Sequence, residues 1–175
     1  VVGVARDITE TRVSQLALAQ SEERLNLALE ASEIGLWDWN IVTDEVYFSS
    51  LWFSMLGYEP GELPQAFETW QDLLHPDDRK GALETVQSSI DRRESSFDIE
   101  FRLKHKGGYY VWIRGLGKSV EQDEEGNTAR LTGIHENIDS RKSNEMILHV
   151  LFYISNAVST TQSLDELYVK IRESL

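Results

Sequence analysis

Three apolar segments joined by two short turns constrain the fold of this chain more than any other feature. The segments cover residues 97–105, 109–120 and 129–138, and each is rich in β-branched and aromatic residues. Lys106-Gly107-Gly108 joins the first two, and a turn this tight needs a residue with positive φ. Residues 123–127 join the second segment to the third. The sequence therefore predicts three consecutive antiparallel strands.

An earlier pair of strands belongs to the same sheet. Residues 35–41 alternate large apolar residues with others, and residues 46–48 follow after the turn residues Thr43-Asp44-Glu45. This pattern predicts a hairpin. Two strands, several helices and then three strands indicate one antiparallel sheet with helices on one face.

Helical segments are expected between the hairpin and the last three strands. Residues 51–57 form a short apolar segment that ends at Gly57, a typical helix stop. Short helical turns are expected around residues 67–74. A firm helix is expected to start at residue 75 and to run to about Arg93, with the Asp77 side chain capping the free amides at its start.

Long helices are expected on both sides of this core. Residues 10–32 contain no Gly or Pro and carry a partial apolar stripe that includes Leu18, Leu25 and Leu29. Residues 143–162 carry a second apolar stripe at helical spacing. The predicted fold class is α+β: a five-stranded antiparallel sheet with helices on one face, flanked by long N- and C-terminal helices.

A short internal repeat suggests how the chain is divided. Gly3-Val4-Ala5-Arg6-Asp7-Ile8-Thr9 is echoed by Gly133-Ile134-His135-Glu136-Asn137-Ile138-Asp139. Coincidence is one explanation. The favoured one is that residues 1–9 end a preceding copy of the same domain, with its last strand at residues 1–8. The domain itself is then expected to cover residues 33–142.

The composition excludes several classes of function. There are 17 Lys and Arg against 30 Asp and Glu, a net charge of −13, so a phosphate-coating nucleic-acid binder is not expected. The absence of Cys excludes disulfides and thiolate metal sites. Apolar runs are far shorter than the roughly 20 residues that span a bilayer, so direct membrane contact is not expected.

Histidine placement argues against an active site. His75, His105, His135 and His149 lie on different predicted elements, with no pair at metal-ligand spacing. His75 lies before Pro76 at the entry to a predicted helix, where its plainest role is hydrogen bonding to the loop. No metal site and no catalytic set of residues are expected.

Several short motifs together resemble a known family. They are Ser21-Glu22-Glu23-Arg24-Leu25, Gly35-Leu36-Trp37-Asp38-Trp39, Leu56-Gly57-Tyr58, His75-Pro76-Asp77-Asp78-Arg79, Glu100-Phe101-Arg102, Trp112-Ile113-Arg114 and Gly133-Ile134. Residues 22–142 resemble a PAS domain of the bacterial sensor type with its C-terminal PAC half. The opening residues are similar to the last strand of a preceding PAS domain, and residues 147–175 resemble the linker and first helix of a GAF domain, whose start is placed at residue 163.

This resemblance implies a fragment of a modular sensor protein, most often a histidine kinase of a two-component phosphorelay. Tandem PAS and GAF modules imply a cytoplasmic location and leave membrane attachment of the parent protein open. Flavin-binding relatives use a photoreactive Cys, which is absent here. Haem-binding relatives use an axial His on the long helix, where residues 77–93 have none. No cofactor is therefore expected.

The candidate pocket is the apolar face of the central strands. Side chains alternate along a strand, so one face of the sheet collects the candidate pocket residues. They are Trp37, Trp39, Ile113, Leu131, Gly133 and His135. Either the tryptophans fill a sealed core, or a small polar-lined cavity near His135 and Trp37 holds a small molecule.

The opposite face of the sheet carries a candidate interface. Trp112, Leu116 and Ile134 lie on it by alternation. One interpretation is that Trp112 is a cross-strand partner that stabilises the sheet. The favoured one is that the helix with Leu18, Leu25 and Leu29 covers this face, in its own chain or in a homodimer.

We therefore expect a sensory and dimerisation module, not an enzyme in itself, that relays a conformational signal between residues 10–32 and residues 141–158. The alternative is a receptor domain that binds a small ligand or cofactor in a diguanylate cyclase or another sensor.

Overall fold

The computed structural model describes residues 2–91 and 96–160 of the 175-residue chain. The chain divides into two compact units, and the boundary falls between Asn137 and Ile138. In chain order the elements are α1 (Val2–Ser32), β1 (Ile34–Asn40), β2 (Glu45–Phe48), α2 (Ser50–Ser54), α3 (Phe67–Leu73), α4 (Pro76–Asp91), β3 (Ser96–Lys104), β4 (Tyr110–Gln122), β5 (Thr128–Asn137) and α5 (Asp139–Thr160).

The five strands form one antiparallel sheet in the order β2-β1-β5-β4-β3. This confirms the predicted fold class. The turns between β3 and β4 and between β4 and β5 contain Gly108 and Gly126, with φ of +89° and +80°. A residue without Cβ adopts these angles at little cost, which is why the Gly-containing turns marked the hairpins correctly.

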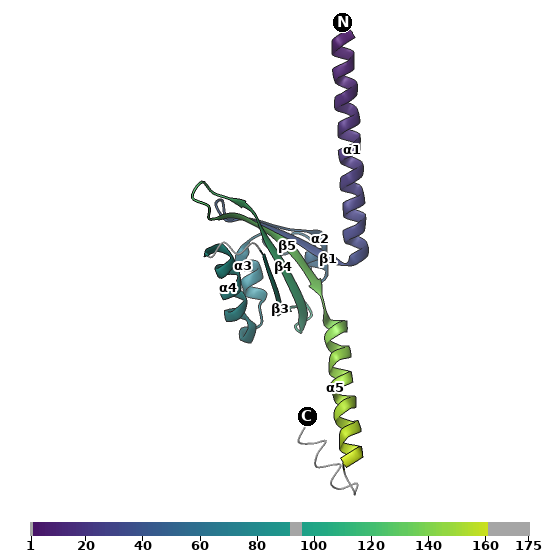
Figure 1. Ribbon diagram of the computed structural model, residues 1–175, viewed down its shortest axis with the longest axis vertical. Coiled ribbons are helices and arrows are strands. Elements are labelled where there is room, and N and C mark those ends of the chain that lie inside the picture. Colours follow the sequence, from purple (N-terminus) through teal and green to yellow (C-terminus); the bar gives the residue numbers. More distant parts are fainter. Residues whose placement is uncertain (1, 92–95, 161–175) are drawn as a thin grey trace. The chain divides into compact units, whose positions relative to one another are not determined.

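Helices α2, α3 and α4 pack against one face of this sheet (Figure 1). Burial along β4 alternates as predicted: Val111, Ile113 and Gly115 are buried, while the residues between them are partly exposed. On β2 the Phe48 ring stacks on Trp52 of α2 with ring centroids 3.9 Å apart. The core of the domain is therefore the layer between the sheet and these helices.

The start of α4 differs from the prediction in one detail. The Asp77 side chain does not cap the helix; instead, the Asp77 backbone N–H donates to Nδ1 of His75 at 3.2 Å. Hydrogen bonding to the loop at this helix entry was the predicted role of His75. The Asp78 carboxylate accepts hydrogen bonds from the Arg102 guanidinium at 2.8 Å and from its backbone N–H at 2.9 Å. The first turn of α4 is thus anchored to β3 because its acids lie beside an arginine.

The strand expected at residues 1–8 is wrong. Helix α1 runs without a break from Val2 to Ser32. A strand needs a neighbouring strand for its backbone hydrogen bonds, whereas a helix satisfies them internally. The origin of residues 1–9 in a preceding domain copy stays a prediction.

Helix α5 confirms the predicted second long helix. Its exposed side chains include a nearly continuous apolar run: Met146, Ile147, Leu148, Leu151, Phe152, Tyr153 and Ile154. Within residues 2–91 and 96–160, no helix is both long and apolar enough to cross a bilayer. The GAF-like start at residues 163–175 lies outside the described residues.

Candidate ligand cavity

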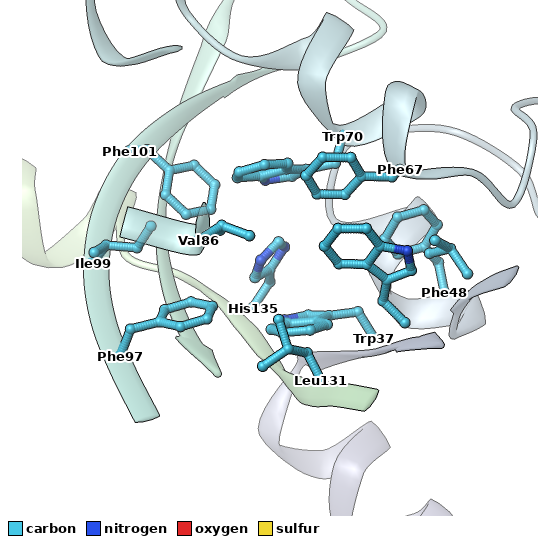
Figure 2. A pocket seen from close by; sticks show the side chains of 12 residues that line it. Trp37, Phe48, Phe67, Trp70, Val86, Phe97, Ile99, Phe101, Leu131 and His135 are labelled. Carbon is cyan, nitrogen blue, oxygen red and sulfur yellow. The ribbon is translucent and has the colours of Figure 1, made fainter. Parts of the chain in front are cut away.

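A cavity of about 40 Å³ lies between the sheet and helices α3 and α4. Twelve side chains from β1, β2, β3, β5, α3 and α4 line it, as Figure 2 shows. A single water needs roughly 10–15 Å³ measured in this way, so the cavity has room for a few waters. It is smaller than the roughly 300–1,000 Å³ typical of pockets for drug-sized ligands.

The walls of the cavity are mostly aromatic. Seven of the twelve side chains are tryptophan or phenylalanine, namely Trp37, Trp39, Phe48, Phe67, Trp70, Phe97 and Phe101. Trp39 stacks on Phe67 with ring centroids 4.1 Å apart. None of the twelve is charged, and the described part of the chain holds no group of three or more His, Asp or Glu placed to bind a metal ion. The cavity therefore suits an apolar or weakly polar occupant.

Glycines in the sheet make room for these rings. Gly133 on β5 lies opposite Trp37 on one side and Gly117 on the other. A Cβ at Gly133 would collide with the Trp37 ring and the Leu116 carbonyl oxygen, and one at Gly117 would collide with the Phe97 ring. The Trp37 and Phe97 rings stack with centroids 6.1 Å apart. The two rings thus lie over strand positions that carry no side chain.

His135 is the one ionisable side chain in the wall. It is 5% exposed, and its Nδ1 accepts a 2.8 Å hydrogen bond from the Trp52 indole N–H. Burial lowers the pKa of His135 to about 3, so the ring is neutral near pH 7. Because Nδ1 accepts, the proton of the neutral ring is on Nε2.

Two buried indoles in the wall lack a partner. Trp37 and Trp70 are 8% and 5% exposed, and neither indole N–H donates to any described residue. By contrast, the Trp39 indole N–H donates to the Asp44 carboxylate at 3.1 Å. Buried indole N–H groups usually find an acceptor, so these two donors distinguish the cavity from an ordinary aromatic core.

The structure brings together four of the six predicted pocket residues: Trp37, Trp39, Leu131 and His135 line the cavity. Ile113 is fully buried in the core outside the lining, and Gly133 lies behind the Trp37 ring. The cavity lies near His135 and Trp37 as the second alternative expected, but its walls are aromatic where polar walls were expected.

Sequence reasoning missed the wall contributed by β3 and α3. Phe97, Ile99 and Phe101 alternate along β3, so the same two-residue period that identified Trp37 and Trp39 could have found them. Phe67 and Trp70 lie three residues apart on the seven-residue helix α3, which is too short to show a periodic pattern.

The outer face of the sheet holds the candidate interface. Trp112 lies opposite Arg102 on β3, whose guanidinium carbon is 5.1 Å from the Trp112 ring centroid. Leu116 and Ile134 are directly paired across β4 and β5, and both are partly exposed. The cross-strand role of Trp112 therefore has structural support.

The α1 side chains that were predicted to cover this interface are largely exposed in the single chain. Leu18 and Leu25 on α1 are 61% and 58% exposed, and Leu29 is partly exposed. The Leu18 and Leu25 side chains are therefore not covered by the sheet of their own chain.

Comparison with known proteins identifies the family. The family model described as PAS fold matches residues 45–135, more than half of the chain. The crystal structure of a sensory box histidine kinase/response regulator from Burkholderia thailandensis E264 aligns with a TM-score of 0.62 at 31% identity, covering 73% of this chain and 93% of that one. The N-terminal domain of a diguanylate cyclase with PAS/PAC sensor from Marinobacter aquaeolei aligns with a TM-score of 0.56 at 24% identity, covering 62% and 98%.

Curated relatives point to signalling proteins of more than one kind. A probable diguanylate cyclase of Escherichia coli (strain K12) is 32% identical over 129 residues, 74% of this chain. A hybrid signal transduction histidine kinase of Dictyostelium discoideum is 22% identical over an alignment covering 82% of this chain. The chain spans 11% of the length of each. The chain belongs to the PAS fold family and is a sensory domain of signalling proteins.

Proposed function

We propose that this domain is a sensory input module in which a change in the cavity is relayed to the helices at its two ends. One observation carries the proposal. The adjacent strands β1 and β5 both line the cavity, through Trp37 and Trp39 and through Leu131 and His135. Each of these strands is also joined to a long helix by one residue.

The connections are short enough to transmit a small movement. Glu33 is the single residue between α1 and β1, and Ile138 is the single residue between β5 and α5. Trp37 lies opposite Gly133 and Trp39 opposite Leu131, so β1 and β5 carry the cavity wall in register. A shift of either strand therefore moves both cavity residues and the end of a helix, because close-packed elements move as units.

We also propose that the module works as a homodimer. The exposed Leu18 and Leu25 on α1 are seven residues apart, the spacing of a helix–helix seam, and Leu29 follows on the same side. In a dimer this seam pairs with its copy or covers the Trp112, Leu116 and Ile134 face of the partner. The Arg102 guanidinium over Trp112 supports the alternative, in which Trp112 stabilises its own sheet.

The parent protein is proposed to be a sensor histidine kinase of a two-component phosphorelay, with a diguanylate cyclase as the second candidate. Relatives of both kinds match this domain. Its neighbours in the parent are proposed to be a preceding PAS domain and a following GAF domain, on the cytoplasmic side. Autophosphorylation of the full-length protein with ATP would support the first candidate, and synthesis of cyclic di-GMP from GTP the second.

The relay is tested with a substitution in the cavity wall, placed on a helix that is not directly connected to α1 or α5. Val86 on α4 lines the cavity, and Val86→Phe adds a ring there. We expect altered amide hydrogen exchange in residues 128–137 and also in residues 139–160. The matched control is Gln87→Phe, one residue further along α4 on the exposed side. Altered exchange that stops at residue 137 would overturn the relay.

A further inference from the structure

We infer that the cavity takes a compact, uncharged molecule that presents a carbonyl-type acceptor to the ring N–H groups of Trp37, Trp70 and His135. This inference rests on the proposed sensory function and names the ligand class of that cavity. The chemistry follows from which polar groups in the wall are satisfied within the protein and which are not.

The two unpartnered indoles are the first part of the argument. Trp37 and Trp70 are each more than nine-tenths buried, yet neither donates to a described residue. The third indole in the wall is satisfied, since Trp39 donates to Asp44, and so is the nearby indole of Trp52, outside the lining, which donates to His135. A buried donor without an acceptor is costly, so an occupant that supplies acceptors gains more here than in a satisfied core.

His135 adds a third donor. Its Nδ1 is engaged by Trp52, so the neutral ring presents its N–H at Nε2, which has no hydrogen-bond partner among the described residues. Figure 2 shows the His135 ring between the rings of Trp37 and Trp70 in that view. All three unsatisfied polar groups in the wall are therefore donors, and an occupant needs acceptors and no donors of its own.

The charge of the cavity wall and the size of the cavity further restrict the class of molecule that can bind. No Lys, Arg, Asp or Glu lines the cavity, so neither an anion nor a cation would find an opposite charge in this desolvated space. Aromatic walls can hold a quaternary ammonium group, but unsatisfied N–H donors disfavour a cation. The cavity volume of about 40 Å³ corresponds to a molecule near the size of acetone. Both indole nitrogens are shielded, so an acceptor in the cavity reaches them only when the neighbouring rings shift.

The inference is tested with four probes of similar size on the 175-residue chain. The indole N–H signals in ¹H–¹⁵N spectra are followed during titration with acetone, 2-propanol, acetate and tetramethylammonium. Acetone is expected to move the Trp37 and Trp70 signals downfield at lower concentration than the other three. Unmoved Trp37 and Trp70 signals up to high acetone concentration, or stronger effects of acetate or tetramethylammonium, would overturn the inference.

Variants of single indoles provide a second measurement. Trp37→Phe and Trp70→Phe each remove one donor and keep an aromatic wall, and each should weaken acetone binding by about three- to tenfold, the worth of one neutral hydrogen bond. Trp39→Phe is the matched control, since its N–H is already bound to Asp44. An equal loss in all three variants would show that ring volume, not the N–H group, determines binding. If a variant does not fold, the titration of the unmodified chain still decides.

The experiments distinguish a failure of the proposed ligand class from a failure of the proposed relay. Acetone binding to Trp37 and Trp70 without any change in amide exchange of residues 139–160 supports the ligand class and counts against the relay. Changed exchange in the Val86→Phe variant without acetone binding supports the relay and overturns the ligand class.

Discussion

The indole N–H of Trp52 donates a 2.8 Å hydrogen bond to Nδ1 of His135 and so joins α2 to β5 inside the core. Glycines flank His135 on both sides, because Gly35 and Gly115 lie opposite it on β1 and β4. A Cβ at Gly35 would approach the Trp52 Cα to 2.8 Å, so this glycine admits the backbone of α2. The pair fixes the tautomer of His135 and holds α2 against the strand that leads to α5.

The first prediction concerns pH. Burial lowers the pKa of His135 to about 3 from the ordinary value of 6.5. Below pH 6.5 the His135 imidazole binds a proton in the unfolded chain but not in the folded chain. The free energy of unfolding therefore falls as pH drops from 6.5 toward 3. The largest slope is about 1.4 kcal/mol per pH unit. Urea denaturation across this range measures it.

The control for this pH effect is His135→Gln, whose side-chain oxygen can still accept from Trp52. Its free energy of unfolding should depend less on pH between about 4.5 and 6. Hydrogen bonds from Arg102 lower the pKa of Asp78 below its ordinary 3.8, so most of that stabilisation is lost below this window, and the loss is common to the variant and the unmodified chain. Equal slopes in the variant and the unmodified chain would mean that His135 does not titrate as the structure requires.

A second prediction compares two buried tryptophans. Trp52→Phe removes a made hydrogen bond and leaves Nδ1 of His135 without its donor, whereas Trp70→Phe removes an N–H with no partner among the described residues. Both changes remove the same volume. Trp52→Phe should therefore lower the free energy of unfolding by about 1–3 kcal/mol more than Trp70→Phe. Chemical denaturation of the two variants gives the difference, and equal losses would contradict it.

The sequence was sufficient to predict the sheet and one side of the cavity. The glycine turns at residues 106–108 and 123–127 marked the hairpins, and alternation placed Trp37, Leu131 and His135 on the inner face. These features depend on local backbone geometry and on the two-residue period of a strand, which are visible in one sequence.

Other features depend on contacts between distant segments. Nothing local indicates that Trp52 reaches His135 across 83 residues, or that the Trp37 and Trp70 indoles are left without partners. The wrong strand prediction at the N-terminus has a similar cause: residues 3–8 match a strand sequence, but within residues 2–91 and 96–160 no strand pairs with that segment, and it is helical.

A third prediction tests the packing of rings over glycines. At Gly133 a Cβ would collide with the Trp37 ring and with the Leu116 carbonyl oxygen, and backbone cannot move aside cheaply. Gly133→Ala should lower the free energy of unfolding by about 1–3 kcal/mol. At Gly81 in α4 a Cβ would meet nothing within 4 Å, so Gly81→Ala should raise stability by about 0.5–1 kcal/mol. Thermal denaturation of both variants would show opposite signs, and a neutral Gly133→Ala would mean that the Trp37 ring can leave the strand.

The last prediction concerns Trp112 on the outer face. If α1 of a partner covers this face, Trp112→Ala should weaken dimerisation and raise amide exchange in residues 11–32 while the core stays folded. If Trp112 serves only to pair with Arg102 across β3 and β4, the variant should keep the dimer mass and the amide exchange rates of residues 11–32. Its free energy of unfolding should fall by about 0.2–1 kcal/mol. Analytical ultracentrifugation and hydrogen exchange separate the two outcomes. Tyr47→Ala is the control, since Tyr47 is an exposed aromatic on the edge strand β2, and it should leave the mass unchanged. A wild-type dimer in the Trp112 variant would remove Trp112 from the interface.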